Sequence, residues 1–139
     1  MHRYLVLGSL TIFVSGCLSS IPQQPYGGFV ASNDFSNAAT LVGVIDKEIP
    51  LIRHKSYVGF CGADDELLSG DYPNVIYMAA GRHSICVAYI TPALSLPDYR
   101  KEISFDINPS ETYTVSAKGR FMGYDYFVHD QSGKQIYPD

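Results

Sequence analysis

The strongest constraint on the fold is a strict alternation of apolar and polar side chains in the C-terminal half of the chain. In EISFDIN (102–108), Ile103, Phe105 and Ile107 are separated by single polar residues. The same two-residue period returns in ETYTVSA (111–117). Because successive side chains of a strand point to opposite faces, both segments are predicted to be half-buried strands.

Turn-forming residues separate these and further strand-like segments. Asn108–Glu111 predicts a hairpin between the two alternating strands, and Gly81 predicts a tight turn between two strands within 74–90. A third hairpin is expected around Gln131–Gly133, joining 125–130 to 134–137. Earlier strands are predicted at 39–45 and 53–61, a polar connection at 62–74 with one helical turn at Asp65–Leu68, and a loop at 91–99.

One segment predicts a strand that is covered on both faces. Ile85, Val87 and Tyr89 share one face, and the other face carries only the small residues Ser84, Cys86 and Ala88. No window repeats apolar residues at helical spacing over eleven residues. We therefore expect an all-β fold: a single antiparallel β-sandwich of seven or eight short strands, of immunoglobulin or prealbumin-like type, over residues 38–139.

The order of these segments resembles a recurrent bacterial pattern. VIYMAAGRHSICVAY, ISFDINPSETYTVSA and YFVHDQSGK follow one another between residues 75 and 136. This succession is similar to small lipoproteins with prealbumin-like or PEGA-like sandwich domains. The resemblance implies a fold, because members of these families are mostly uncharacterised accessory or surface proteins.

The N-terminus has the features of a secretory signal. A basic head (His2, Arg3) precedes an apolar run of eleven residues, Tyr4 to Val14. That run is too short to span a bilayer, which takes about 20 residues. It has the length of a signal-peptide core.

The residues that follow are Val14-Ser15-Gly16-Cys17, which resemble the lipobox of bacterial lipoproteins. This resemblance implies cleavage before Cys17 and acylation of its thiol. Leu18, in place of aspartate, favours the outer membrane. We expect the domain to face the periplasm. The alternative is an ordinary secreted protein with an incidental cysteine.

The predicted organisation therefore has three parts: a signal peptide (1–16), a lipidated N-terminus with a flexible tether (17–37) and the sandwich (38–139). The tether is rich in Ser, Pro, Gln, Gly and Asn. Its phrase PYGGF (25–29) leaves open docking onto the domain.

Charge restricts the partners. After removal of residues 1–16 the chain has nine Lys and Arg against fourteen Asp and Glu, a net charge of −5. This balance argues against nucleic acid, whose recognition needs clustered cations. It also argues against electrostatic adhesion to anionic lipid, so attachment to the membrane is expected through the acyl chains.

With Cys17 acylated, Cys61 and Cys86 remain as a possible pair. In an oxidising compartment they can form a disulfide, and the alternatives are two buried thiols or a catalytic cysteine. The sequence does not decide between them.

Few residues suggest catalysis or metal binding. The acidic residues Asp64, Asp65, Glu66 and Asp71 match no known calcium-loop spacing and indicate a solvated loop. His54, His83 and His129 lie on separate strand-like segments without ligand spacing in the sequence. Nucleophile-elbow and phosphate-binding patterns are absent from the sequence, so we expect no enzyme and no cofactor.

The segment GRFMGYDYF (119–127) is the one candidate interaction site. It concentrates Phe121, Met122, Tyr124 and Tyr126 near two glycines, and residues of these types are common in interface cores. Core packing is the alternative explanation. We expect a lipid-anchored accessory or protein-interaction module of the envelope, with an immunity-type inhibitor or a glycan- or ligand-binding lipoprotein as the second hypothesis.

Overall fold

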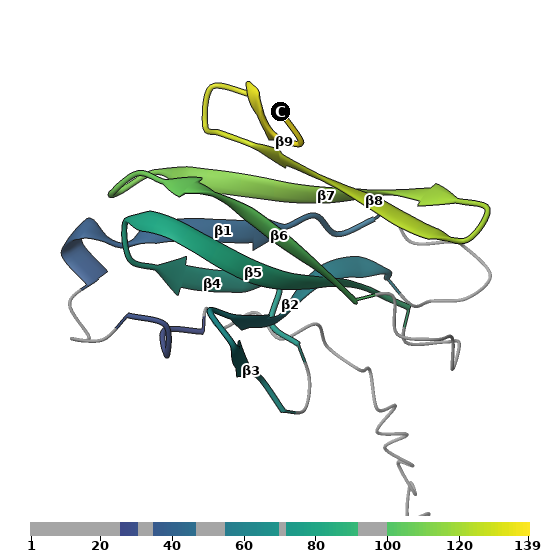
Figure 1. Ribbon diagram of the computed structural model, residues 1–139, viewed down its shortest axis with the longest axis horizontal. Coiled ribbons are helices and arrows are strands. Elements are labelled where there is room, and N and C mark those ends of the chain that lie inside the picture. The colour runs from purple at the N-terminus through teal and green to yellow at the C-terminus, as the bar shows by residue number, and fades with distance from the viewer. Residues whose placement is uncertain (1–25, 31–34, 47–54, 70–71, 92–99) are drawn as a thin grey trace, which may run out of the picture.

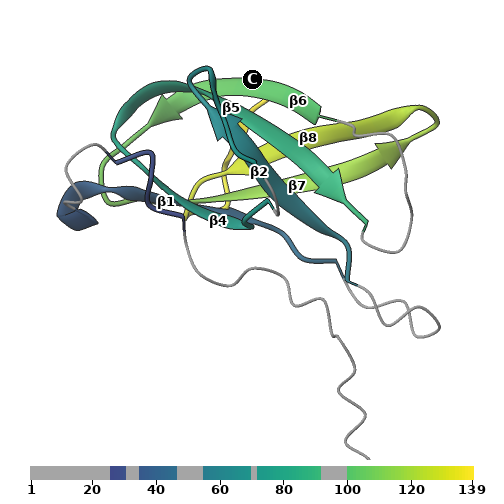
Figure 2. The same cartoon turned by 90° about the horizontal axis from the view of Figure 1, so that it is seen from below.

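The computed structural model describes residues 26–30, 35–46, 55–69, 72–91 and 100–139. Nine strands in this part of the chain form two sheets that pack face to face (Figures 1 and 2). The architecture is the predicted all-β sandwich. Within the same ranges, no helix is long and apolar enough to cross a membrane.

The five-stranded sheet has the order β4-β1-β7-β8-β9. Its strands are β4 (Val75–Met78), β1 (Ala39–Gly43), β7 (Thr112–Arg120), β8 (Gly123–His129) and β9 (Gln135–Tyr137). A 3-10 turn, η1 (Phe35–Asn37), precedes β1. The pair β1–β7 is parallel and the other pairs of neighbouring strands are antiparallel.

The four-stranded sheet has the order β3-β2-β5-β6. Its strands are β3 (Glu66–Leu67), β2 (Tyr57–Ala63), β5 (Gly81–Ile90) and β6 (Arg100–Ile107). An immunoglobulin sandwich places its first two strands side by side in one sheet. Here β1 and β2 belong to opposite sheets, so the strand order differs from that of an immunoglobulin sandwich.

The core lies between the two sheets and is formed by the alternating residues. Ile103, Phe105 and Ile107 are buried, and their polar neighbours on β6 are exposed. Tyr113 and Val115 are buried in the same way on β7. The predicted alternation is therefore confirmed on both strands.

Strand β5 is covered on both faces, as predicted. Ile85 and Val87 are completely buried in the main core. On the opposite face, Cys86 and Ala88 form a second apolar cluster that is packed against Tyr72.

Two of the three predicted hairpins are wrong in their pairing. The strands on either side of Ala80-Gly81 are β4 and β5, and those on either side of 108–111 are β6 and β7. In each case the chain crosses from one sheet to the other, and the two strands do not pair. The turn residues correctly predicted where the chain reverses. They do not specify whether the next strand joins the same sheet or the opposite one, and here it joins the opposite one.

The third hairpin, β8–β9, is confirmed. Asp130 organises its turn, because one carboxylate oxygen accepts hydrogen bonds from the backbone N–H groups of Ser132 (2.9 Å) and Lys134 (3.0 Å) and from the Ser132 hydroxyl (2.6 Å). Gly133 has a φ of 83°. The Ser132 hydroxyl bond is the main cause that lowers the pKa of Asp130 below its usual 3.8.

The helical turn expected at Asp65–Leu68 is wrong. Asp64 and Asp65 form a tight turn with φ of 48° and 68°, and β3 begins at Glu66. Aspartate tolerates this left-handed region better than most residues. The turn is held to β5, because Asp64 N–H donates to Ser84 O (2.8 Å) and Ser84 N–H donates to the Asp64 carboxylate (3.0 Å).

The chain joins the two sheets directly after β1. Val44 N–H donates to Val115 O (2.8 Å) in one sheet, and Val44 O accepts from Val58 N–H (2.9 Å) in the other. Gly43 permits this crossing, because a Cβ atom there would lie closer than 3.0 Å to the Val58 carbonyl oxygen.

Residues Tyr26–Val30 dock onto the sandwich, the alternative that PYGGF left open. Tyr26 N–H donates to Val75 O and its carbonyl accepts from Tyr77 N–H, both at 2.9 Å, which extends the β4 edge. Val30 is buried, and Phe29 packs against the core. Of the rest of the predicted N-terminal region, residues 1–25 and 31–34 lie outside the described residues, and 35–37 form η1.

Candidate functional site

The β7–β8 hairpin projects from one end of the sandwich (Figure 1). Val115 is the last β7 residue that is paired with β1, and β9 pairs only with Val128 and His129 of β8. Beyond these positions the hairpin continues as a two-stranded ribbon to the closing pair Arg120–Gly123.

Two large apolar side chains occupy the apex of this hairpin. Phe121 is fully exposed and Met122 is 84% exposed. The left-handed backbone of the turn falls on Gly123 (φ 113°) and not on either of them. The turn therefore needs neither side chain for its geometry. We call Phe121 and Met122 the hairpin tip.

The other two predicted contact residues point inward. Tyr124 and Tyr126 share a face, as their parity predicted, but that face packs on the core. Tyr126 is 2% exposed, and the Tyr124 ring stacks on Tyr89 of β5 at 4.2 Å between centroids. The exposed part of the predicted patch is thus Phe121 and Met122.

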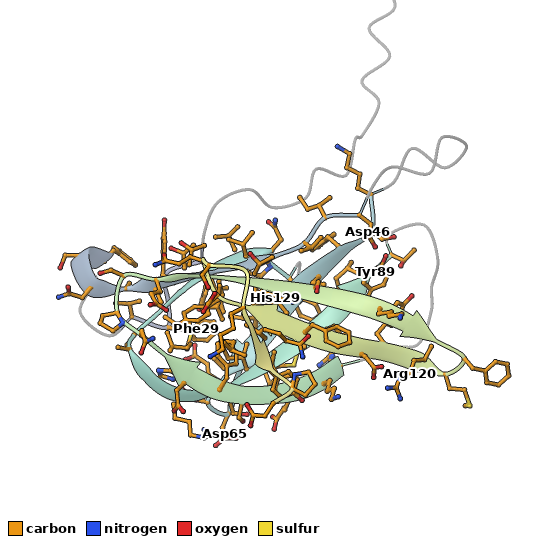
Figure 3. All side chains as sticks on the ribbon, turned by 90° about the horizontal axis from the view of Figure 1, so that it is seen from above. Phe29, Asp46, Asp65, Tyr89, Arg120 and His129 are labelled. Atoms are coloured by element: carbon orange, nitrogen blue, oxygen red, sulfur yellow. A yellow bond between two sulfur atoms is a disulfide. The ribbon has the colours of Figure 1, made fainter. Side chains whose placement is uncertain are left out.

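Tyr89 of β5 fixes the hairpin to the four-stranded sheet close to its apex, because Tyr124 follows the closing pair Arg120–Gly123 directly. The Tyr89 ring contacts Tyr124, and its hydroxyl donates to the Asp46 carboxylate (Figure 3). Partial burial, together with the Asp46 carboxylate, raises the pKa of Tyr89 to about 12. Tyr89 is therefore a neutral hydrogen-bond donor at physiological pH.

The charged side chains around the tip are mostly basic. This end of the sandwich also holds the start of β2, the end of β5 and the start of β6. Its described charged residues are five cations and three carboxylates, for a net charge of +2: Lys55, Arg100, Lys101, Lys118, Arg120, Asp46, Glu102 and Asp125. We call this the basic end. Arg120 forms an ion pair with Asp125 there.

The opposite end is strongly acidic. In Figure 3, Arg120 marks the basic end and Asp65 marks this opposite end. With histidine neutral, its described charged residues are seven carboxylates and two cations, for a net charge of −5: Asp64, Asp65, Glu66, Asp106, Glu111, Asp130, Asp139, Arg82 and Lys134. We call this the acidic end. Sequence reasoning missed the separation of charge because it depends on which strand ends lie together.

A polar cleft of about 260 Å³ opens at the acidic end. Its ionised lining residues are Arg82, Asp106, Glu111, Asp130 and Asp139. Arg82 pairs with Asp106 at 3.3 Å, and Glu111 accepts from the Tyr113 hydroxyl at 2.7 Å. Asp130 holds the β8–β9 turn. Arg82, Asp106, Glu111 and Asp130 are therefore bonded within the strands and turns around the cleft.

The predicted metal and acid–base candidates do not come together where they are described. No group of three His, Cys, Asp or Glu side chains within the described ranges is placed to hold a metal ion. His83 lies 2.5 Å from Asp64 and 3.0 Å from Ala79 O, and His129 is on β8 opposite Thr114. His54 and Asp71 lie outside the described residues.

The Asp64 carboxylate connects the β2–β3 turn to β5. Partial burial alone would raise its pKa, but the hydrogen bonds from His83 and from Ser84 N–H outweigh it. The net effect lowers the pKa of Asp64 below 3.8.

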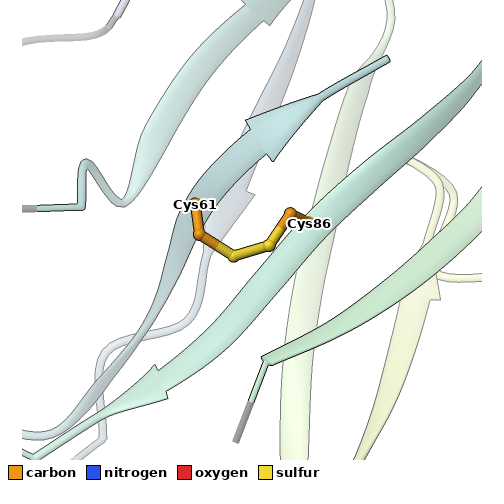
Figure 4. Close-up of a disulfide and its surroundings, with 2 residues drawn as sticks. All are labelled: Cys61 and Cys86. Atoms are coloured by element: carbon orange, nitrogen blue, oxygen red, sulfur yellow. A yellow bond between two sulfur atoms is a disulfide. The ribbon is translucent and has the colours of Figure 1, made fainter. Parts of the chain in front are cut away.

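Cys61 and Cys86 form the predicted disulfide between β2 and β5 (Figure 4). Their Cα atoms are 5.0 Å apart, and Cys61 lies in a bulge of β2 between Phe60 and Gly62. Both residues are buried under Tyr72. This resolves the alternatives in favour of the bonded pair. Cys17 lies outside the described residues.

Comparisons of the chain with protein-family models, with curated proteins and with solved structures found no match.

Proposed function

We propose that the chain is a lipid-anchored, non-enzymatic protein of the bacterial envelope that acts as an accessory contact module through its hairpin tip. In this proposal the mature protein begins at Cys17, is acylated there and is held at the outer membrane facing the periplasm. The support for the anchor is the sequence: a basic head, a short apolar core and Val14-Ser15-Gly16-Cys17 occur in register.

The observation that carries the contact function is the exposure of Phe121 and Met122. Isolated apolar residues are common on protein surfaces, but adjacent ones at the apex of a projecting hairpin are not explained by folding. Polar residues at these two exposed positions would make the protein more soluble, and the turn does not require Phe or Met. A contact with another envelope component accounts for both facts.

The polar groups of the cleft support the non-enzymatic part of the proposal. The carboxylates of Asp106, Glu111 and Asp130 are bonded to neighbours that hold strand connections together. Their chemistry is explained by the fold.

Photocrosslinking in living cells tests the contact. A diazirine amino acid is placed at Phe121, and in a matched control at Gln131, which is an exposed turn residue at the acidic end. We expect crosslinked adducts from position 121 and not from 131. Equal crosslinking from both positions, or none from 121, would contradict a contact function of the tip.

A further inference from the structure

The hairpin tip has the chemistry of a membrane-docking element. Building on the proposed function, we propose that Phe121 and Met122 insert into the interface of the anionic phospholipid membrane that holds the acyl anchor. The tip is then a second, reversible attachment that orients the sandwich on the bilayer.

The order of side chains along the hairpin suits insertion into a membrane interface. Phe121 and Met122 form the apex, and Arg120 and Lys118 follow one and three residues behind Phe121 on β7. A strand advances about 3.3 Å per residue, so these cations lie within about 10 Å of the apex. Apolar side chains that dock at an interface reach about 5–10 Å into the boundary between headgroups and acyl chains. At that depth Lys118 and the Arg120–Asp125 ion pair lie at the level of the lipid phosphates, where this part of the hairpin has a net charge of +1.

The distribution of charge over the sandwich favours an anionic surface at the tip. A net charge of −5 argues against adhesion to anionic lipid if the charge is spread evenly over the surface. The described charges are instead separated, with +2 at the basic end that carries the tip and −5 at the acidic end. An anionic surface attracts the first end and repels the second, and so it favours the orientation with the tip down.

The N-terminal chain is long enough for the acyl anchor and the tip to reach one membrane. Tyr26 is in register with Ile76, Leu41 and Tyr113, and Phe121 is eight residues further along β7 from Tyr113. Tyr26 therefore lies about 26 Å above the tip along the strand direction. Nine Cα–Cα steps lead from Cys17 to Tyr26, which allows a span of at most about 32 Å. The acyl chains can remain in the membrane while the tip touches it.

The size of the tip favours lipid over a protein pocket. A stable protein–protein interface takes about 800 Å² from each partner, with some 20 residues a side. Two side chains supply much less than this. A weak contact is sufficient when an anchor already holds the tip at a high local concentration near the membrane.

Tryptophan fluorescence tests the proposal, because the chain has no tryptophan of its own. Phe121→Trp and the control Gln131→Trp are prepared as full-length lipidated protein in vesicles of phosphatidylglycerol or phosphatidylcholine. In phosphatidylglycerol, we expect the emission of the Phe121→Trp variant to shift to the blue and to be quenched at least threefold by brominated acyl chains. The Gln131→Trp variant should remain unquenched. Adding Lys118→Glu to Phe121→Trp should at least halve its quenching in the anionic vesicles.

Three outcomes would overturn the proposal. An unquenched indole at position 121, on protein that floats with the vesicles, would exclude lipid contact and leave the proposed contact function intact. A blue shift that appears only after addition of an envelope protein fraction would assign the tip to a protein partner. Protein that carries no acyl chains and does not float would overturn both the anchor and this inference.

Discussion

At the scale of single residues, the sandwich depends on close backbone approaches that only glycine allows. Gly43 ends β1 where the chain crosses to β2, and a Cβ atom there would overlap with Val58 O. Gly119 on β7 has ordinary space, since its nearest atom to a Cβ would be Tyr124 Cε1 at 3.7 Å.

These two glycines make a matched pair of variants. We expect Gly43→Ala to lower the free energy of unfolding by about 3 kcal/mol or more, because backbone must move to remove the overlap. Gly119→Ala should change it by less than about 1 kcal/mol. Urea unfolding measures both values, and equal effects would show that the crossing at Gly43 is not tight.

Asp64 contributes stability that depends on pH. Because folding lowers its pKa below 3.8, the folded state binds the proton less tightly than the unfolded state. The stabilisation is therefore present above about pH 4 and is lost as the pH falls through the folded-state pKa.

We predict that Asp64→Asn lowers the free energy of unfolding at pH 7 by less than about 1 kcal/mol, since the carboxylate is half-exposed. The difference from the unmodified protein should shrink as the pH falls below about 4. Asp65→Asn makes the same charge change in the same turn and is the control. A pH-independent difference for Asp64→Asn would contradict the linkage to its carboxylate.

At the scale of elements, the sequence predicted strands better than it predicted their partners. Alternation along β6 and β7 is a local property, so the buried positions Ile103, Phe105 and Tyr113 could be predicted directly. Pairing is not local. The turn residues between β6 and β7 would suit a hairpin equally well, but here they carry the chain from one sheet to the other. The same limit explains the error at the β4–β5 connection.

The candidate site shows a similar division. Parity predicted that Tyr124 and Tyr126 share a face, but whether that face is inside depends on β5, whose Tyr89 meets Tyr124. The exposed tip and the basic end could be assigned only when the strand ends had been placed in space. The disulfide was predicted as one of three alternatives, and the β2 bulge that brings Cys61 to Cys86 has no signal in the sequence.

The Cys61–Cys86 disulfide should make a large contribution to stability. It closes a loop with a sequence separation of 25. In the chain-entropy model such a loop contributes about 3 kcal/mol. We expect Cys61→Ala/Cys86→Ala to lower the free energy of unfolding by about that amount, and Cys17→Ser, its control, to leave it unchanged. An unchanged value for the double variant would contradict a structural role of the disulfide.

The side chains of the hairpin tip should contribute little to the stability of the fold. Phe121→Ser/Met122→Ser should change the free energy of unfolding by at most about 0.5 kcal/mol, because both side chains are exposed. Tyr126→Ala, on the same hairpin, should lower it by about 3 kcal/mol or more, because its ring is buried. Urea unfolding compares the two. A large loss of stability in the tip variant would contradict the view that the tip is free for contact.

The energy of the tip is consistent with a secondary attachment. Burial of a Phe and a Met side chain stabilises by about 1.5–3 kcal/mol each. A total near 4 kcal/mol corresponds to a dissociation constant of about 1 mM. Such a contact is negligible for a freely diffusing protein and becomes populated for one that is already held at the membrane.

At the scale of the whole molecule, the sandwich is asymmetric. The apolar tip and the basic end lie together, the acidic end lies away from them, and the docking of Tyr26–Val30 fixes where the N-terminal chain leaves the β4 edge. With a membrane anchor at Cys17, the tip and the basic end face the bilayer and the acidic end faces away from it.

Intact-mass analysis of the mature protein purified from membranes tests the anchor most directly. The account predicts a chain that begins at Cys17 and carries acyl chains, and a Cys17→Ser variant that takes up no fatty-acid label and is found in the soluble fraction. An unmodified mature protein with a different first residue would contradict the central claim.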